Sequence, residues 1–176
     1  MNQHHGMRPQ DIAVLLKIII SNPGWMSKDI AQDLVLSPAE VSYSLQRSAQ
    51  AGLLDASKKT VMRKAFLEFI QYGLPRVFPA IRGPLAVGIP TAFSSPAISP
   101  YLMTNQLNDL VIWPHAEGEA RGETISPLYP NAVQAALKDE TLYHLLSLVD
   151  VMRMGKVREK EIALRLLKEK FNIQDA

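Results

Sequence analysis

The chain of 176 residues contains no cysteine. A disulfide framework, thiol catalysis and a zinc site built on thiolates are therefore excluded. It also lacks an apolar run long enough to span a bilayer, because the longest run, residues 12–20, is interrupted by Lys17 and predicts a buried helix. Residues 1–5 lack the charged-then-apolar layout of a signal peptide, so we expect a cytoplasmic protein with no membrane contact.

Motifs of the common enzyme classes are also missing. The chain has neither the Gly-Lys-Ser/Thr ending of a P-loop nor a Gly-x-Ser-x-Gly elbow. His115, Glu117 and Glu119 alternate, and on a strand they would share a face that suits a divalent metal. Pro114 and Gly118 favour a solvated loop instead. We therefore expect no enzymatic activity, no catalytic residue, no metal site and no cofactor.

Charge is scarce and unevenly spread. The formal net charge is +2, and 47% of the residues are hydrophobic, which is enough for a packed core. Residues 1–82 carry ten Lys and Arg against six Asp and Glu, whereas residues 83–176 carry nine against eleven. A basic first half favours a polyanionic partner such as nucleic acid.

Apolar residues recur at helical spacing through most of the first half. The pattern predicts helices over residues 9–21, 27–34, 37–51 and 60–72, with Gly73 as the C-cap of the last one. Ser37-Pro38-Ala39-Glu40 has the form of a capping box with proline at the first helical position. Between the third and fourth helices there is room only for a minimal wing.

The middle of the chain is rich in proline. Six of the twelve prolines lie in residues 74–100, which predicts an irregular and mostly extended segment. Residues 110–113 and 123–128 have the pattern of short strands that flank a hairpin or loop. Helices follow over residues 131–137, 141–153 and 156–171. We therefore expect a mainly α fold with a winged helix-turn-helix at residues 1–73, a proline-rich extended segment with a short β hairpin at 74–130, and C-terminal helices at 131–176 for dimer or partner contact.

Two short helices joined by a tight corner can place the second helix in the major groove of DNA. Ala31 is small where the two helices would touch, and the capped start of the second helix offers free N–H groups to phosphate. The DNA-binding residues expected on the second helix are Ser37, Ala39, Glu40, Ser42, Tyr43, Gln46 and Arg47. Those expected to follow the phosphate backbone are Lys58, Lys59 and Arg63. Helical units with this spacing also serve as protein-docking modules, and Tyr43 suits packing on a neighbouring helix equally well.

The stretch "DIAQDLVLSPAEVSYSLQRSAQAGLL" resembles the winged helix-turn-helix of MarR-like transcriptional regulators. The resemblance is carried by Ala31, the corner at residues 36–38, Val41-Ser42 and the exit at residues 51–54, and it covers residues 8–64. It implies double-stranded DNA as the partner, a homodimer and a role as a repressor or autoregulator. The nearly absent wing departs from the family pattern.

The second half, "LVIWPHAEGEARGETISPLYPNAVQAALKDETLYHLLSLVDVMRMG", is similar to bacterial regulators found beside abortive-infection nucleotidyltransferase-like toxins. This resemblance implies an alternative function, an antitoxin or other interaction module that binds a protein through its C-terminal half. A third alternative is a regulator with a ligand among Leu85, Ile89, Phe93 and Trp113. The charged amphipathic helix at residues 156–171 suits either a solvated face or a dimer seam.

Overall fold

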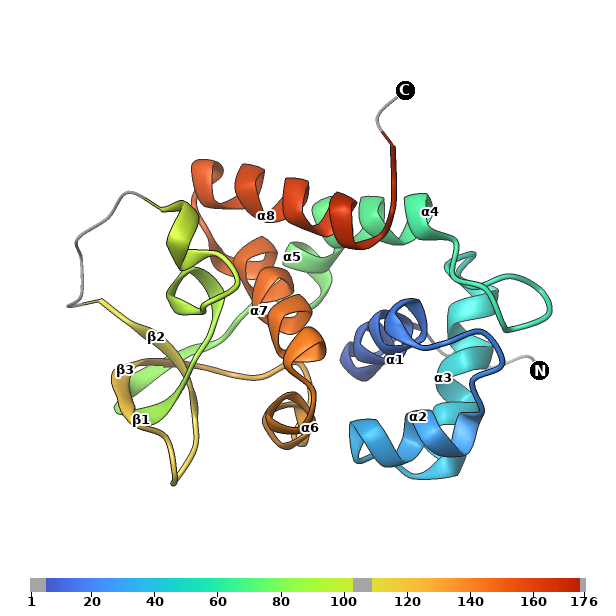
Figure 1. The fold of residues 1–176 in the computed structure, drawn as a ribbon, viewed down its shortest axis with the longest axis horizontal. Coiled ribbons are helices and arrows are strands. Elements are labelled where there is room, and N and C mark those ends of the chain that lie inside the picture. The colour runs from blue at the N-terminus through green and yellow to red at the C-terminus, as the bar shows by residue number, and fades with distance from the viewer. Residues whose placement is uncertain (1–5, 103–108, 175–176) are drawn as a thin grey trace.

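The computed structural model describes residues 6–102 and 109–174 and has an α/β architecture (Figure 1). The expectation of a mainly α fold with a short hairpin is wrong, because three strands form a mixed sheet. Helices α2 (Ser27–Leu34) and α3 (Pro38–Gln50) lie at one end of the molecule, the sheet lies at the other, and α7 (Glu140–Met154) runs between them (Figure 1). Among the helices that the structure describes, none has both the length and the apolar character that crossing a bilayer requires.

Three helices build the N-terminal unit: α1 (Pro9–Ile20), α2 (Ser27–Leu34) and α3 (Pro38–Gln50). They begin and end at or beside the residues expected from sequence. Residues 11–16 of α1 are all buried, because α2, α3 and α7 pack around that helix. Val41 and Leu45 bury the inner face of α3, as their spacing predicts.

The fourth helical stretch is longer than expected. It runs through α4 (Arg63–Glu68), the π-helical turn η1 (Phe69–Gly73) and α5 (Leu74–Val77) without a break, so Gly73 is not its C-cap. The wider π turn ends at Gly73, two residues before Pro75, which cannot donate a backbone hydrogen bond. This local widening accommodates the missing donor at Pro75. The helix therefore continues past Gly73, the residue that was expected to end it.

The sheet consists of β1 (Arg82–Pro90), β2 (Val111–Pro114) and β3 (Ala120–Ile125), and the short 3-10 turns η2 (Ala92–Ser94) and η3 (Ser99–Tyr101) follow β1. Each strand pairs with both others in a small closed arrangement. β1 is antiparallel to β2 and β3, whereas β2 and β3 are parallel to each other, so the segment between them is not a hairpin. The prolines are accommodated because Pro84 lies at a register irregularity and Pro90 ends the strand.

A close backbone approach permits this closure. The loop between β2 and β3 crosses β1, and a Cβ atom added at Gly118 would overlap the backbone of Gly88. A Cβ atom at Gly88 would in turn overlap the carbonyl of Trp113. Parallel strands are usually joined by a dozen or more residues. Here a much shorter loop is sufficient, because two glycines let the backbones touch.

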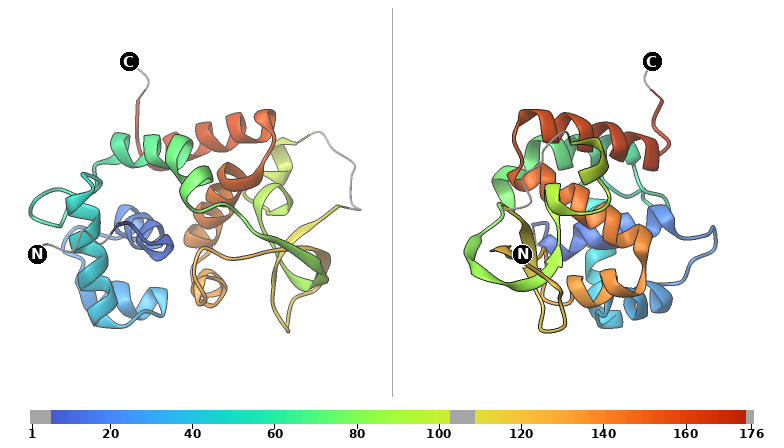
Figure 2. Two further views of the ribbon diagram at one scale, coloured as in Figure 1. Left: turned by 180° about the vertical axis from the view of Figure 1, so that it is seen from behind. Right: turned by 60° about the vertical axis from the view of Figure 1, so that its left-hand side comes forward.

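The C-terminal helices are α6 (Ala132–Lys138), α7 (Glu140–Met154) and α8 (Val157–Lys170). α7 is buried almost all round, since α1, α5, α6, α8 and the turn η2 surround it. The further views in Figure 2 show α8 lying along one side of the molecule, and there Phe171 stacks on Phe66 of α4 with ring centroids 5.5 Å apart. The buried side chains of both halves form one continuous core.

One charged cluster joins the N-terminal helices to α7, and a second joins the sheet region to α7. Lys17 of α1 contacts Asp139 at the start of α7 (2.7 Å) and Asp33 of α2 (3.1 Å). Asp150 of α7 is fully buried and accepts hydrogen bonds from Thr91, Trp113 and Arg153. The sheet and the N-terminal helices are therefore both anchored to α7.

Candidate nucleic-acid interface

The first turn of α3 is open to an anion. Ser37 is its N-cap, and its hydroxyl accepts a hydrogen bond from the backbone N–H of Glu40 at 3.1 Å. Ser37, Pro38 and Ala39 are all exposed. Pro38 has no N–H and the N–H groups of Glu40 and Val41 donate to Ser37, so the Ala39 N–H and the partial positive charge of a 13-residue helix are what this turn offers to a phosphate.

An exposed polar stripe continues from that turn along α3. Ser42, Tyr43 and Gln46 are exposed, and Tyr43 keeps 60% of its surface accessible. Gln50 is also exposed one turn further on, although it was not among the residues expected to bind DNA. The spacing could have predicted this, because a residue four positions after Gln46 lies on the same face of a helix. The stripe offers hydroxyl and amide groups that hydrogen-bond base edges and phosphates.

Two residues expected on that face point elsewhere. Arg47 is 6% exposed and donates two hydrogen bonds to the fully buried Asp11 of α1, at 2.9 and 2.7 Å. Glu40 accepts hydrogen bonds from Arg47 (2.6 Å) and from Gln10 (3.0 Å), instead of closing the capping box. The reason is that α1 lies beside α3 and presents a buried carboxylate to it.

This network fixes the charge of its members. The hydrogen bonds to Asp11 outweigh burial and raise the pKa of Arg47 further above its ordinary value. Burial by itself would raise the pKa of Glu40, but the hydrogen bonds from Arg47 and Gln10 lower it overall. Arg47 and Glu40 therefore hold α3 against α1 and are not available to the exposed stripe.

The minimal wing is a turn closed by the bridge between Leu54 and Val61. Asp55 organises it, because its carboxylate accepts hydrogen bonds from the Ser57 hydroxyl and from the backbone N–H groups of Lys59 and Thr60. These bonds, that of Ser57 first, lower the pKa of Asp55 to about 2. The carboxylate is therefore charged at neutral pH and keeps the turn in shape.

The turn presents two lysines to solvent. Lys58 and Lys59 are both exposed, and Lys58 adopts a positive φ of 60°, which is uncommon for a residue other than glycine. The ammonium of Lys59 lies 4.5 Å from the centre of the Trp25 ring, whose Nε1–H donates to the Lys59 carbonyl. The wing is thereby fastened to the segment that precedes α2. Arg63 has a different role, since its guanidinium donates to the carbonyl of Phe171 at 2.7 Å.

The corner between α2 and α3 is held from the second half of the chain. Val35 adopts the left-handed conformation (φ 56°, ψ 46°), which is strained for a β-branched residue. The Tyr129 hydroxyl donates to the carbonyl of Leu34 (2.8 Å), and the Asn131 amide donates to that of Val35 (3.0 Å). Burial raises the pKa of Tyr129, so its hydroxyl stays a donor. Sequence reasoning missed both interactions, because they join residues that are far apart in the chain.

Of the other residues singled out from sequence, Leu85 and Phe93 line one cavity, and the rest are not brought together with them. Glu117 and Glu119 are exposed in the loop after β2, and within residues 6–102 and 109–174 no group of three His, Asp or Glu side chains could hold a metal ion. Trp113 is buried against Asp150, whereas Leu85 is 66% exposed. These two residues therefore do not line one ligand pocket.

Comparison with protein-family models, with curated protein sequences and with solved structures found no match to this chain.

Proposed function

We propose that the protein binds double-stranded DNA as a MarR-like transcriptional regulator, with α3 in the major groove. The observation that carries the proposal is the exposed stripe of Ser42, Tyr43 and Gln46, which begins at a capped helix N-terminus. The lysine-bearing turn at residues 55–60 follows α3 and is fixed through Trp25 to the start of α2. One helix supplies groups that read bases, and the turn supplies charges that neutralise phosphate.

The roles within this interface follow from exposure. Gln46 is the residue best suited to a bidentate contact with adenine, while Ser42 and Tyr43 suit phosphate or sugar. Ser37 and Ala39 lie at the helix start, where the Ala39 N–H and the positive end of the helix dipole meet a phosphate. Lys58 and Lys59 follow the backbone from the wing. A two-fold dimer would present two copies of α3 to neighbouring half-sites, as expected of a repressor or autoregulator.

Fluorescence anisotropy on labelled duplexes from the region upstream of its own gene tests the proposal. We expect specific binding whose log affinity falls linearly with log salt concentration. A scrambled duplex of equal length is the control, and it should bind more weakly. Equal affinity for both duplexes, or no salt-dependent binding at all, would refute the proposed function.

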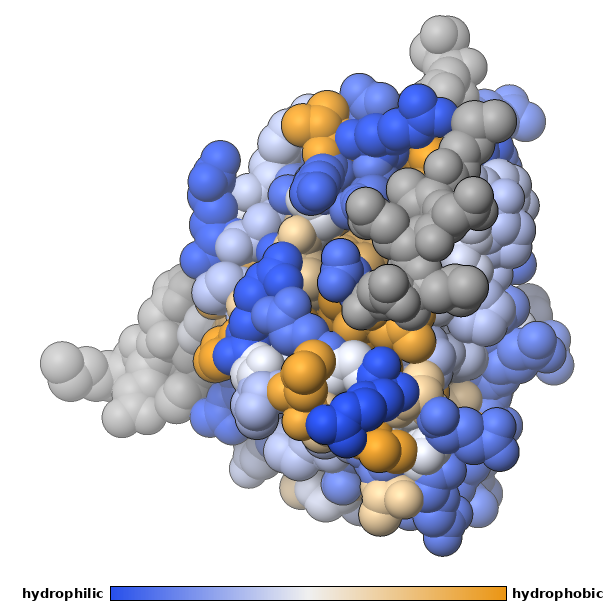
Figure 3. All heavy atoms as spheres, turned by 90° about the vertical axis from the view of Figure 1, so that its left-hand side faces the viewer, coloured by the Kyte–Doolittle hydropathy of each residue, from blue (hydrophilic) through white to orange (hydrophobic). Residues whose placement is uncertain are grey.

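A second candidate function is binding of a protein partner, such as a toxin, through the C-terminal half. It is favoured by apolar side chains left exposed on and beside β1: Ile81 (70%), Leu85 (66%) and Val87 (43%). Figure 3, which views the molecule from the sheet side, shows hydrophobic surface interspersed with hydrophilic residues there. Exposed apolar groups on one strand are typical of an interaction surface.

This surface could join two copies of the chain or bind a different protein. Sedimentation analysis of the purified protein and of a Leu85→Ser, Val87→Ser double variant distinguishes these two cases. If it joins two copies of the chain, the variant sediments as a smaller species. If it serves a different protein, both forms sediment alike, and only the wild type co-purifies with the product of a neighbouring gene. Co-purification of both forms would argue against this surface.

A further inference from the structure

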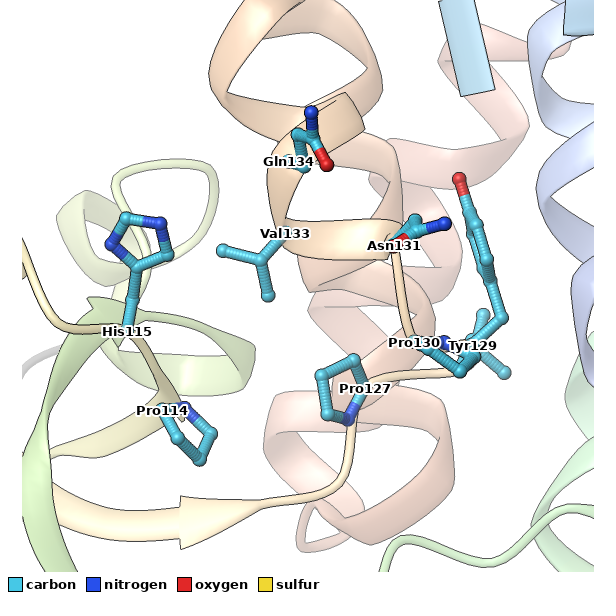
Figure 4. A pocket seen from close by; sticks show the side chains of 9 residues that line it. Pro114, His115, Pro127, Tyr129, Pro130, Asn131, Val133 and Gln134 are labelled. Atoms are coloured by element: carbon cyan, nitrogen blue, oxygen red, sulfur yellow. The ribbon is translucent and has the colours of Figure 1, made fainter. Parts of the chain in front are cut away.

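A cavity of about 650 Å³ opens between the end of β2, the segment that joins β3 to α6, and the first turn of α6 (Figure 4). Figure 4 shows the His115 ring and the Val133 side chain on facing sides of this space, with Pro114 and Pro127 below them. The lining residues are Pro114, His115, Pro127, Leu128, Tyr129, Pro130, Asn131, Val133 and Gln134.

The chemistry of this lining selects a class of ligand. None of the nine residues is Asp, Glu, Lys or Arg, so the cavity lining offers no counter-ion to a charged ligand. Proline rings form much of the wall and give rigid apolar surface to a ring or a short alkyl group. Gln134 is exposed and offers both a donor and an acceptor. His115 accepts a hydrogen bond from the Glu117 N–H on Nδ1 (3.3 Å), so the neutral ring carries its proton on Nε2 as a second donor.

The same lining reaches the helix-turn-helix corner. Tyr129 and Asn131 belong to the cavity wall, and they also donate to the carbonyls of Leu34 and Val35. The strained conformation of Val35 persists only while its surroundings hold it. Any movement of Tyr129 or Asn131 is therefore transmitted to the corner that sets the angle between α2 and α3.

We propose that this cavity binds a small uncharged ring compound bearing an amide or similar donor–acceptor pair, and that occupancy resets the helix-turn-helix corner through Tyr129 and Asn131. The regulatory meaning rests on the proposed function, since resetting the corner changes how α3 meets DNA. The apolar body lies against Pro114, Pro127 and Val133. The polar end pairs with Gln134 and with the Nε2–H of His115.

Benzamide serves as the probe, and benzoate and benzylamine are charged controls of nearly the same size. In two-dimensional amide NMR of the full chain without DNA, benzamide should shift the signals of Val133, Gln134 and His115. It should also shift those of Leu34 and Val35, which lie outside the cavity lining. The charged controls should leave both groups of signals unchanged at the same concentration. Absence of benzamide shifts, or equal shifts with the charged controls, would overturn the binding site.

Two variants separate binding from transmission. Gln134→Ala should weaken benzamide binding about tenfold, which corresponds to the removal of one hydrogen bond, while DNA affinity in the absence of probe stays unchanged. Asn131→Ala should leave the shifts at Val133 and Gln134 in place and abolish those at Val35. Tyr129→Phe keeps the ring packing but removes the hydrogen bond to the Leu34 carbonyl, so it tests transmission through Tyr129 if Asn131→Ala does not fold. Undiminished shifts at Leu34 and Val35 in both variants would refute transmission by this route. Because the NMR measurements contain no DNA, their outcome is independent of the anisotropy test of the proposed function.

Discussion

The guanidinium of Arg47 on α3 donates two hydrogen bonds, of 2.9 and 2.7 Å, to the carboxylate of Asp11 on α1 in the protein interior. Asp11 is fully buried and Arg47 is 6% exposed. The pair makes the position of α3 depend on a charge in α1. An arginine that sequence reasoning assigned to DNA is thus a residue that sets where the DNA-facing helix lies.

Replacing Arg47 by alanine should lower the free energy of unfolding by about 3–5 kcal/mol, because it leaves the buried Asp11 carboxylate without its cationic partner and with the backbone N–H of Arg8 as its remaining donor. The double variant Asp11→Leu, Arg47→Met should recover much of this loss, since it removes both charges. Urea denaturation monitored by circular dichroism measures both effects. An Arg47→Ala protein of unchanged stability but altered sequence preference would show instead that Arg47 contacts DNA.

Replacing Gln46 by alanine should weaken binding to the preferred duplex by about 1–3 kcal/mol and relax the preference at one base pair. Stability should hardly change, because the side chain is exposed. Anisotropy titrations against single-base variants of the duplex measure the preference. Gln134→Ala, which alters an exposed glutamine on α6, is the matched control. An equal reduction of affinity in both variants would argue against base contact by Gln46.

Replacing Lys58 and Lys59 by alanine should weaken binding to all duplexes alike. The slope of log affinity against log salt should become shallower by about 0.9 for each phosphate that the lysines no longer neutralise. Lys138→Ala, at an exposed position on α6, should leave the slope unchanged. A steepened or unaltered slope in the wing variant would exclude these lysines from the phosphate path.

The wing should titrate with Asp55. Its folded pKa of about 2 lies below the ordinary value near 3.9, so its contribution to stability is present above about pH 4 and is lost as the pH falls through about 2. The amide signals of Lys59 and Thr60 should therefore move with a midpoint near 2 in an NMR titration. Asp55→Asn should remove this transition, whereas a wild-type midpoint near 4 would mean that the hydrogen bonds do not persist in solution.

Replacing Gly118 by alanine should destabilise the fold by about 1–3 kcal/mol, because the added methyl group meets the backbone of Gly88 and one strand must shift. Gly6→Ala is the control, since nothing lies within 4 Å of the added atom. Thermal unfolding of the two variants compares them directly. Equal melting temperatures would show that β2 and β3 do not require the close approach.

Local patterns in the sequence determined the first three helices. The spacing of apolar residues, Pro38 and the Ser37 cap fix the limits of α1, α2 and α3, because these signals act within one or two turns. The same patterns also placed the extended segments close to β2 and β3. They left the strand pairing open, since pairing joins residues that are remote in the chain.

Tertiary structure alone decided the sheet and the orientation of the charged residues. Parallel pairing of β2 with β3 depends on the close backbone approach of Gly88 and Gly118, which the spacing of residues in the sequence does not predict. The inward turn of Arg47 depends on Asp11, which lies 36 positions away and acts only once α1 packs on α3. The spacing of apolar residues shows which side of a helix faces the core. The partner of a charged residue at the edge of that side depends on which other element packs beside the helix in the folded chain.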